Sequence, residues 1–310
     1  MRIAMMGSGG IGGCIGARLA EVGADVSFIA RGAHLQAMRE KGLTVASPLG
    51  DVILPKVNAS DRAEEIGPVD VVVFAVKTYD SENAAASLGP LLKRTTRVVT
   101  LQNGIDSVET LGRHVPPDQV IGGATYLSAF IAKPGEIVHA GGLTQVLIGG
   151  SDDPLIRAFE EIGARAKGIG LHSIEDIDNV LWEKFVTLSA FSGGTALIRS
   201  GIGPIYADPE ARTFIEQLRD EGMSVATAAG HPMPEGFVDR VRERWAVLPP
   251  ETKSFMANDL DRGKPIEVAW LSGRMHELGG RLGVPTPGHT AVYRALHLHA
   301  LGSGKSLVTS

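Results

Sequence analysis

The sequence contains almost no cysteine and no long apolar segment. Cys14 is the only cysteine among 310 residues, so the chain cannot form an internal disulfide. A single thiol fits a reducing compartment. The most apolar stretch, residues 69–76, is far shorter than the roughly 18 residues that cross a membrane, and Asp70 interrupts it. We therefore expect a cytoplasmic protein without a membrane partner, in which Cys14 packs in a core.

Aromatic residues are scarce, and basic residues are not in excess. Phe, Trp and Tyr make up 5% of the chain, and 35 acidic residues outnumber 30 basic ones, which gives a net charge of −5. The sequence therefore offers no aromatic platform or basic stripe for nucleic acid. Nine histidines are present, but His297 and His299 would face different sides of a helix, and no set has metal-ligand spacing. We expect no nucleic-acid partner and no metal site, which leaves small molecules as ligands.

Glycine is abundant at the start of the chain. An apolar strand over residues 3–6 leads into a G-x-G-x-x-G motif and then into a helical pattern that Gly23 ends. In this motif the first glycine permits a tight turn, the second lets the backbone approach a pyrophosphate, and the third brings helix and strand together. The motif predicts a dinucleotide site made by Gly7, Ser8, Gly9, Gly10, Ile11 and Gly12. The alternative is a glycine-rich turn that only packs a helix onto a sheet.

The residue after the second strand indicates which dinucleotide is bound. Sites that prefer NAD usually carry an acid there, which holds the ribose hydroxyls, whereas an arginine accommodates a 2′-phosphate. This chain has Arg31, whose guanidinium offers forked donors and stays charged. Arg31 therefore predicts NADP(H) as the cofactor. The alternative is a solvated surface arginine.

Strands and helices alternate to about residue 150, and one more helix and strand follow up to residue 173. Lys77 follows a buried strand over residues 70–76, and Asn103 follows a strand over residues 97–101. Because the carboxyl ends of parallel strands meet at one edge of a sheet, we expect both side chains beside the glycine motif. A solvated end charge and a turn-forming Asn-Gly pair are the alternatives. Short β segments between residues 120 and 148 are expected to complete the same sheet.

The second half of the chain is almost entirely helical. Helical patterns cover residues 175–190, 209–230, 235–245, 265–282 and 286–301, and polar residues 302–310 are typical of a flexible tail. A chain of 310 residues also exceeds what one hydrophobic core usually serves. We predict an α/β fold, with an N-terminal Rossmann-type doubly wound sheet over residues 1–173 and an all-α substrate domain over residues 174–310.

Taken in order, these features resemble the ketopantoate reductase family over nearly the whole chain. The motifs that carry the resemblance are Gly7–Gly12, Arg31, Val76-Lys77, Leu101–Gly104, Pro134-Gly135, Leu181–Lys184 and Pro265–Glu267. The resemblance implies a Rossmann domain, a helical domain and an active site between them. It also implies NADPH-dependent reduction of 2-dehydropantoate to pantoate, a step toward pantothenate and coenzyme A. The substrate would be a small ketoacid, and the oligomeric state stays open, with a homodimer among the alternatives.

The resemblance further implies roles for individual residues. Lys184 would be the catalytic lysine, and Glu267 would support it and contact the cofactor. Lys77 and Asn103 would lie near the ribose and nicotinamide, and Asn103 would also reach the substrate. The chemistry agrees, because hydride transfer to a ketone builds negative charge on the oxygen, which a lysine can neutralise and protonate. From the residues alone, a surface lysine and a solvated helix-end acid remain alternatives.

The expected substrate-binding positions depart from the family pattern. Leu188 and Ser192 stand four and eight residues beyond Lys184, where the family carries asparagines. Thr252 and Phe255 replace a further asparagine and serine, with Ser254 adjacent. Fewer polar donors predict altered substrate specificity rather than altered cofactor binding. Two alternatives follow: a related reductase acting on a different ketoacid or ketone, and an NADP(H)-sensing protein without turnover.

Overall fold

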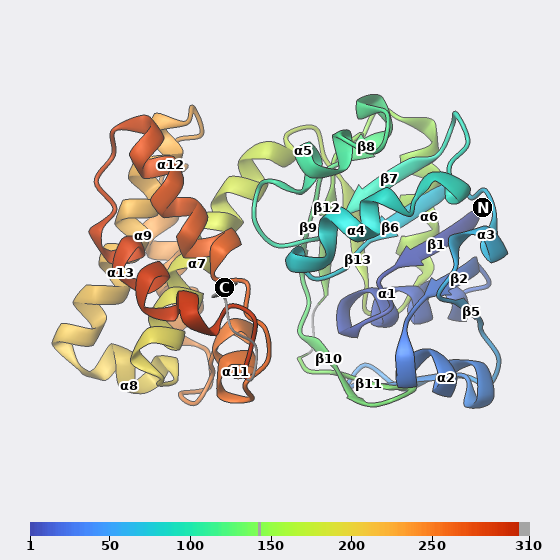
Figure 1. Cartoon of the computed structure of the whole chain (residues 1–310), viewed down its shortest axis with the longest axis horizontal. Coiled ribbons are helices and arrows are strands. Elements are labelled where there is room, and N and C mark those ends of the chain that lie inside the picture. Colours follow the sequence, from blue (N-terminus) through green and yellow to red (C-terminus); the bar gives the residue numbers. More distant parts are fainter. Residues whose placement is uncertain (142–143, 304–310) are drawn as a thin grey trace, which may run out of the picture. The chain divides into compact units, whose positions relative to one another are not determined.

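The chain forms two compact units. The computed structural model describes residues 1–141 and 144–303, and contacts divide it into Met1–Asp178 and Asn179–Ser310 (Figure 1). The division falls at the start of a long helix, whereas the sequence analysis placed it after residue 173, at the end of a strand. Residues 304–310 of the expected flexible tail lie outside the described residues.

A six-stranded parallel sheet forms the centre of the first unit, as predicted for a doubly wound fold. Its strands, in spatial order, are β5 (Asn58–Ser60), β2 (Asp25–Ile29), β1 (Arg2–Met6), β6 (Val71–Phe74), β7 (Arg97–Thr100) and β8 (Val120–Ile121). The connecting helices include α1 (Gly10–Glu21), α2 (Gly32–Lys41), α3 (Ala63–Ile66), α4 (Ser81–Ala86) and α5 (Ser107–Gly112). Strand order reverses beside β1, and ligands of such sheets bind there, beyond the strands' carboxyl ends.

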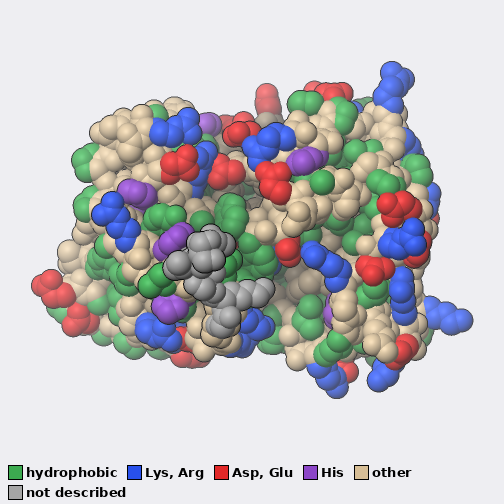
Figure 2. Space-filling model, in the orientation of Figure 1, with side chains coloured by type: hydrophobic (Ala, Val, Ile, Leu, Met, Phe, Trp, Pro, Cys, Tyr) green, Lys and Arg blue, Asp and Glu red, His purple; other side chains and the backbone are tan. Residues whose placement is uncertain are grey.

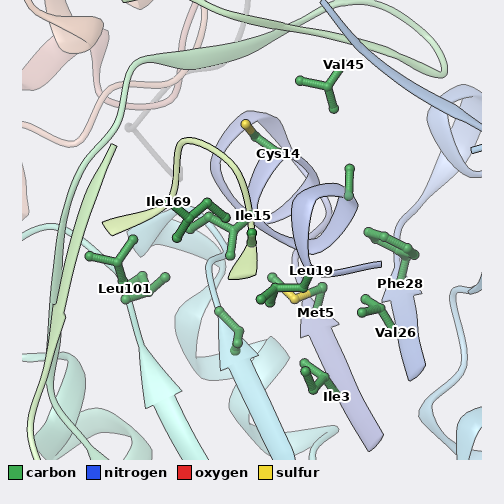
Figure 3. Close-up of a cluster of buried hydrophobic side chains, with 14 of the residues drawn as sticks. Ile3, Met5, Cys14, Ile15, Leu19, Val26, Phe28, Val45, Leu101 and Ile169 are labelled. Carbon is green, nitrogen blue, oxygen red and sulfur yellow. The ribbon is translucent and has the colours of Figure 1, made fainter. Parts of the chain in front are cut away.

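Both faces of this sheet are buried. Successive side chains of a strand point to opposite faces, and each set packs in its own hydrophobic cluster. Ile3 and Met5 of β1 pack with Leu19 of α1 and Phe28 of β2 in one hydrophobic cluster (Figure 3). The alternate residues of β1 join a second cluster with helices α3, α4 and α5. The near-continuous apolar run of β1 is thus what a strand covered on both faces requires.

The expectation that the segments between residues 120 and 148 complete the same sheet is wrong for all but β8. Strand β9 (Gly123–Tyr126) pairs with β12 (Gln145–Ile148), which pairs with β13 (Gly170–Ser173) in a three-stranded sheet. A separate four-stranded sheet contains β10 (Ala129–Lys133), β11 (Glu136–His139), β3 (Leu43–Ala46) and β4 (Val52–Leu54). Hydrophobic periodicity predicts that a segment is a strand, but not which strand it pairs with. For β10 and β11 the position in the fold depends on contacts with helix α1.

Helix α1 provides those contacts through its glycines. A Cβ placed on Gly10 would lie 2.2 Å from the carbonyl oxygen of Ala129, and one on Gly13 would lie 2.3 Å from the Ile137 side chain. The hairpin β10–β11 therefore packs directly against the helix that starts at the glycine motif. This packing places part of the four-stranded sheet beside the candidate dinucleotide loop.

The second unit is helical, as predicted. Its helices are α7 (Ile177–Ile198, which begins in the first unit), α8 (Ile202–Ala207), α9 (Pro209–Ala228), α10 (Phe237–Ala246), α11 (Phe255–Asp261), a π-helical turn η4 (Ala269–Gly273), α12 (Arg274–Leu282) and α13 (Pro287–Leu296). No described helix is both long and apolar enough to cross a lipid bilayer.

Three helix boundaries differ from the sequence prediction by more than two residues. One is the end of α13, which lies at Leu296 rather than at residue 301. Helix α7 runs past residue 190 to Ile198, because Gly193 and Gly194 serve packing rather than termination. A Cβ on Gly194 would lie 2.8 Å from the Ile215 side chain, and one on Gly193 would lie 3.0 Å from Ser272 Oγ. The helix expected from residue 265 instead begins at Ala269 with the π turn, so Glu267 precedes it. π turns occur often at functional sites.

Candidate functional site

The glycine motif forms the connection from β1 to α1. Gly7 has a φ of +96°, and a Cβ there would lie 2.7 Å from the Val76 backbone nitrogen. A Cβ on Gly12 would lie 2.2 Å from the Gly7 carbonyl oxygen, so neither position accepts a side chain. Gly9 is the N-cap of α1, and a Cβ added there would meet nothing within 4 Å. The helix N-terminus, which favours anions, is therefore open beside Gly9.

Two side chains in the motif belong to the fold rather than to this open space. Ser8 is buried; its N–H donates to the Ile29 carbonyl at 2.9 Å, and its hydroxyl donates to the Met5 carbonyl at 3.3 Å. Ile11 packs against the main hydrophobic cluster. Phosphate contact by this loop would therefore come from backbone N–H groups.

Arg31 lies at the carboxyl end of β2, as the N-cap residue of α2. Its side chain is 67% exposed, and its Nη2 lies 3.3 Å from Oδ2 of Asp80. Asp80 belongs to a short 3₁₀ turn, Thr78–Asp80, that follows β6. This acid could not be predicted from the sequence, because nothing in the spacing of residues 31 and 80 indicates that they meet.

Lys77 and Asn103 follow neighbouring parallel strands, so they lie at the edge that also holds the glycine motif. Lys77 is exposed, and Asn103 is half-buried. Gln102, a motif residue for which the sequence analysis predicted no role of its own, is buried, and its Nε2 donates to the Val76 carbonyl at 2.9 Å and to Ser81 Oγ at 2.7 Å. This amide holds the ends of β6 and β7 together.

His34 is a second residue that the sequence analysis passed over. Its Nδ1 accepts a hydrogen bond from the Gly135 N–H at 3.1 Å, and its buried Nε2 has no hydrogen-bond partner among the described residues. Burial lowers the pKa of His34, while the Ser8 backbone acts in the opposite direction. The His34 ring therefore joins α2 to the β10–β11 turn.

In the second unit, Lys184 lies on α7 with its ammonium fully buried. Burial lowers the pKa of Lys184 from its ordinary 10.5 to about 8, and the negative charge of Glu267 acts in the opposite direction. Glu267 is itself buried, just ahead of the π turn. The fold thus brings two residues 83 positions apart into electrostatic interaction.

The other expected substrate-binding residues occupy two segments of this unit. Leu188 is half-buried and Ser192 is buried, one and two turns beyond Lys184 on α7. Thr252 is half-buried in the loop before α11, and its carbonyl accepts the Ile202 N–H at 3.0 Å.

Ser254 and Phe255 differ in their environments. Ser254 is the buried N-cap of α11; its Oγ accepts the Ala257 N–H at 3.0 Å and lies 3.0 Å from Thr195 Oγ1. Phe255 begins the helix and is 42% exposed. The Ser254 hydroxyl is thus already occupied by a helix cap and a threonine.

Other reactive groups are few in the described part of the chain. Burial raises the pKa of the Cys14 thiol to about 11, which disfavours a reactive thiolate. No group of three or more His, Cys, Asp or Glu side chains lies close enough together to hold a metal ion among the described residues. Acidic and basic side chains are interspersed on the face drawn in Figure 2.

Comparison with known proteins covers nearly the whole chain. The profile of the family "Ketopantoate reductase PanE/ApbA" matches residues 3–153, and that of "Ketopantoate reductase PanE/ApbA C terminal" matches residues 176–300. A 2-dehydropantoate 2-reductase of Mesorhizobium japonicum is 30% identical over 98% of this chain and 99% of that protein.

Solved structures agree with these matches. The crystal structure of 2-dehydropantoate 2-reductase from Geobacter metallireducens superposes with a TM-score of 0.89 at 30% identity, covering 96% of this chain and 99% of that one. D-mandelate dehydrogenase, solved with NADH and anilino(oxo)acetate, gives a TM-score of 0.86 at 21% identity, covering 97% of this chain and 98% of that one. At that identity the second likeness is one of fold.

Proposed function

Because the chain belongs to the ketopantoate reductase family, an oxidoreductase family, we propose that it reduces the ketone of a 2-oxo acid with NADPH and that 2-dehydropantoate is its substrate. The product would be pantoate, a precursor of pantothenate and coenzyme A. The family match spans both units, so the proposal draws on the cofactor loop as well as on the lysine.

The observation that carries the proposal is the buried Lys184 ammonium in interaction with Glu267. NADPH, when bound, supplies the hydride that reduces the carbonyl carbon. Lys184 would stabilise the negative charge that develops on the carbonyl oxygen and then give that oxygen a proton from Nζ. The negative charge of Glu267 raises the pKa of Lys184 and so favours its charged form, against the effect of burial.

We assign cofactor binding to the edge of the parallel sheet. The backbone of the loop over residues 7–12 would hold the pyrophosphate at the open N-terminus of α1. Arg31 would pair with the 2′-phosphate, and Lys77 and Asn103 would contact the ribose and nicotinamide portions. Glu267 would complete the cofactor contacts as well as support Lys184.

We assign substrate binding to Asn103, Lys184 and the residues near Lys184. These further residues are Leu188, Ser192, Thr252, Ser254 and Phe255. Leu188 presents an apolar side chain one turn from Lys184, and this observation favours a second candidate, a 2-oxo acid with a larger apolar substituent. A protein that only senses NADP(H) would have no use for the buried Lys184–Glu267 pair, so turnover is the stronger reading.

The test is NADPH oxidation by the purified protein with 2-dehydropantoate and with a panel of other 2-oxo acids. Lys184→Ala should lose about 10²–10⁴-fold in kcat while keeping its affinity for NADPH. Lys93→Ala is the matched control, because Lys93 pairs with Asp70 at the opposite edge of the sheet. NADPH binding without turnover on any ketoacid would contradict the proposed function, and near-parent kcat in Lys184→Ala would assign the proton to another group.

A further inference from the structure

Arg31, which we assign to the 2′-phosphate, already forms an ion pair with the carboxylate of Asp80. Arg31 Nη2 lies 3.3 Å from Asp80 Oδ2, and the two side chains are 67% and 37% exposed. Both are therefore accessible to a ligand. Arg31 follows β2 and Asp80 follows β6, so two strand ends on either side of β1 contribute one basic and one acidic group to the same place.

The position of Asp80 is fixed by the turn that carries it. The Asp80 N–H donates to the Lys77 carbonyl at 2.9 Å, which closes the 3₁₀ turn. Gln102 Nε2 binds the Val76 carbonyl before this turn and Ser81 Oγ after it. Asp80 precedes α4, yet its carboxylate makes no capping bond to that helix. The turn is thus anchored on both sides and presents the carboxylate to Arg31.

We propose that Asp80 is a specificity-determining residue that reduces the preference of this protein for NADPH over NADH. The inference rests on the assignment of Arg31 to the 2′-phosphate. In a site that prefers NAD, an acid beyond the second strand accepts hydrogen bonds from the ribose hydroxyls. Here an arginine occupies that position, and the acid follows β6, on the other side of β1.

Two physical effects of the Asp80 carboxylate both shift the cofactor preference from NADPH toward NADH. The carboxylate competes with the 2′-phosphate for one guanidinium, and its negative charge repels a phosphate that carries close to two charges. NADH has a 2′-hydroxyl instead, which can donate a hydrogen bond to the same carboxylate. Asp80 therefore weakens NADPH binding and supports NADH binding.

The test is a set of dissociation constants for NADPH and NADH, measured by fluorescence titration in the parent, Asp80→Asn, Arg31→Ala and the double variant. Asp80→Asn should raise the ratio Kd(NADH)/Kd(NADPH) by about 3- to 10-fold, and this rise should shrink at high salt. Within the Arg31→Ala background the gain for NADPH should be smaller, because competition for the guanidinium is gone.

Glu82→Gln is the matched control. It removes a negative charge two residues away, but Glu82 pairs with Arg113 and His114 of a different segment, so the ratio should change less than about twofold. An unchanged or lower ratio in Asp80→Asn overturns the inference; a lower ratio would mean that Asp80 only orients Arg31. If Arg31→Ala leaves NADPH affinity unchanged, the assignment of Arg31 itself is wrong, which is a separate result.

Discussion

At the scale of single residues, the site depends on the cost of burying a charge. The Lys184 ammonium is buried, which lowers its pKa to about 8, and Glu267 limits this decrease. The unfolded chain, with a lysine pKa near the ordinary 10.5, binds more protons than the folded chain between these two values. The contribution of Lys184 to the free energy of unfolding therefore rises with pH between about 8 and 10.5. At neutral pH, below this range, the buried lysine lowers the free energy of unfolding.

The same pKa predicts a pH dependence of catalysis. If protonated Lys184 is the active form, kcat/KM should be constant below about pH 8 and decrease with a slope of about tenfold per pH unit above it. Glu267→Gln should move this decrease to lower pH, because it removes the charge that raises the lysine pKa. Lys184→Arg should abolish it, since a guanidinium stays charged, even at reduced turnover. A parent profile that is flat to pH 10 would contradict the assignment.

Residue types could be predicted from sequence more readily than residue pairs. Gly7, Arg31 and Lys184 each have a chemical reason to stand where they do in the motifs. The contact of Arg31 with Asp80 joins residues 49 positions apart, and it depends on which strands become neighbours. The contact of His34 could not be predicted for a related reason, because its Nδ1 accepts a hydrogen bond from a turn about 100 residues away.

At the scale of elements, local pattern was enough for the parallel sheet and for most helices. Apolar runs ending in glycine or polar residues identify β1, β2, β6 and β7, since each is buried on both faces. The same reasoning failed for β9 to β12, whose half-buried segments could join any sheet edge. It also ended α7 at residue 190, although the helix continues to Ile198 and uses Gly193 and Gly194 to contact its neighbours.

Packing at the start of α1 predicts opposite behaviour for two adjacent glycines. Gly10→Ala should lower the free energy of unfolding by about 1–3 kcal/mol, because its Cβ would lie 2.2 Å from a backbone oxygen of β10. Gly9→Ala should cost less than about 1 kcal/mol, since its Cβ enters open space. Gly9→Ala should nevertheless weaken NADPH binding by about tenfold or more, because that space is where the pyrophosphate would approach.

Urea unfolding and NADPH titration of both variants provide the measurement. The expected pattern is a stability defect in one variant and a binding defect in the other. Equal unfolding midpoints would mean that the β10–β11 hairpin does not pack against α1 as described, and unchanged NADPH affinity in Gly9→Ala would place the pyrophosphate elsewhere.

At the scale of the whole molecule, fold and family define the reaction class but not the substrate. The chain shares its fold with a 2-dehydropantoate 2-reductase at a TM-score of 0.89 and with D-mandelate dehydrogenase at 0.86, so overall similarity does not separate these activities. Under the proposed function, discrimination between 2-oxo acids would come from a few side chains near Lys184. Leu188 and Ser192 are the strongest candidates, because they stand on the same face of α7.

Placing amides at these two positions tests how much Leu188 and Ser192 lower the activity on 2-dehydropantoate. An amide that is missing beside a buried polar group of the substrate costs on the order of 1–3 kcal/mol. Leu188→Asn with Ser192→Asn should therefore raise kcat/KM for 2-dehydropantoate by about tenfold or more, and lower it for 2-oxo acids with large apolar substituents. NADPH affinity should not change, because the cofactor contacts are assigned to other residues.

Leu197→Asn is the matched control, since it places an amide on a half-buried position of α7 that lies on another side of the helix from Lys184. It should leave the ratio of kcat/KM values for the two kinds of substrate unchanged, even if it lowers stability. An efficient parent that gains nothing from the two asparagines would show that polar groups such as Thr252, or bound water, already take the place of the missing amides. Leu188 would then be compatible with 2-dehydropantoate, and substrate choice would have to be sought at Asn103 or Phe255.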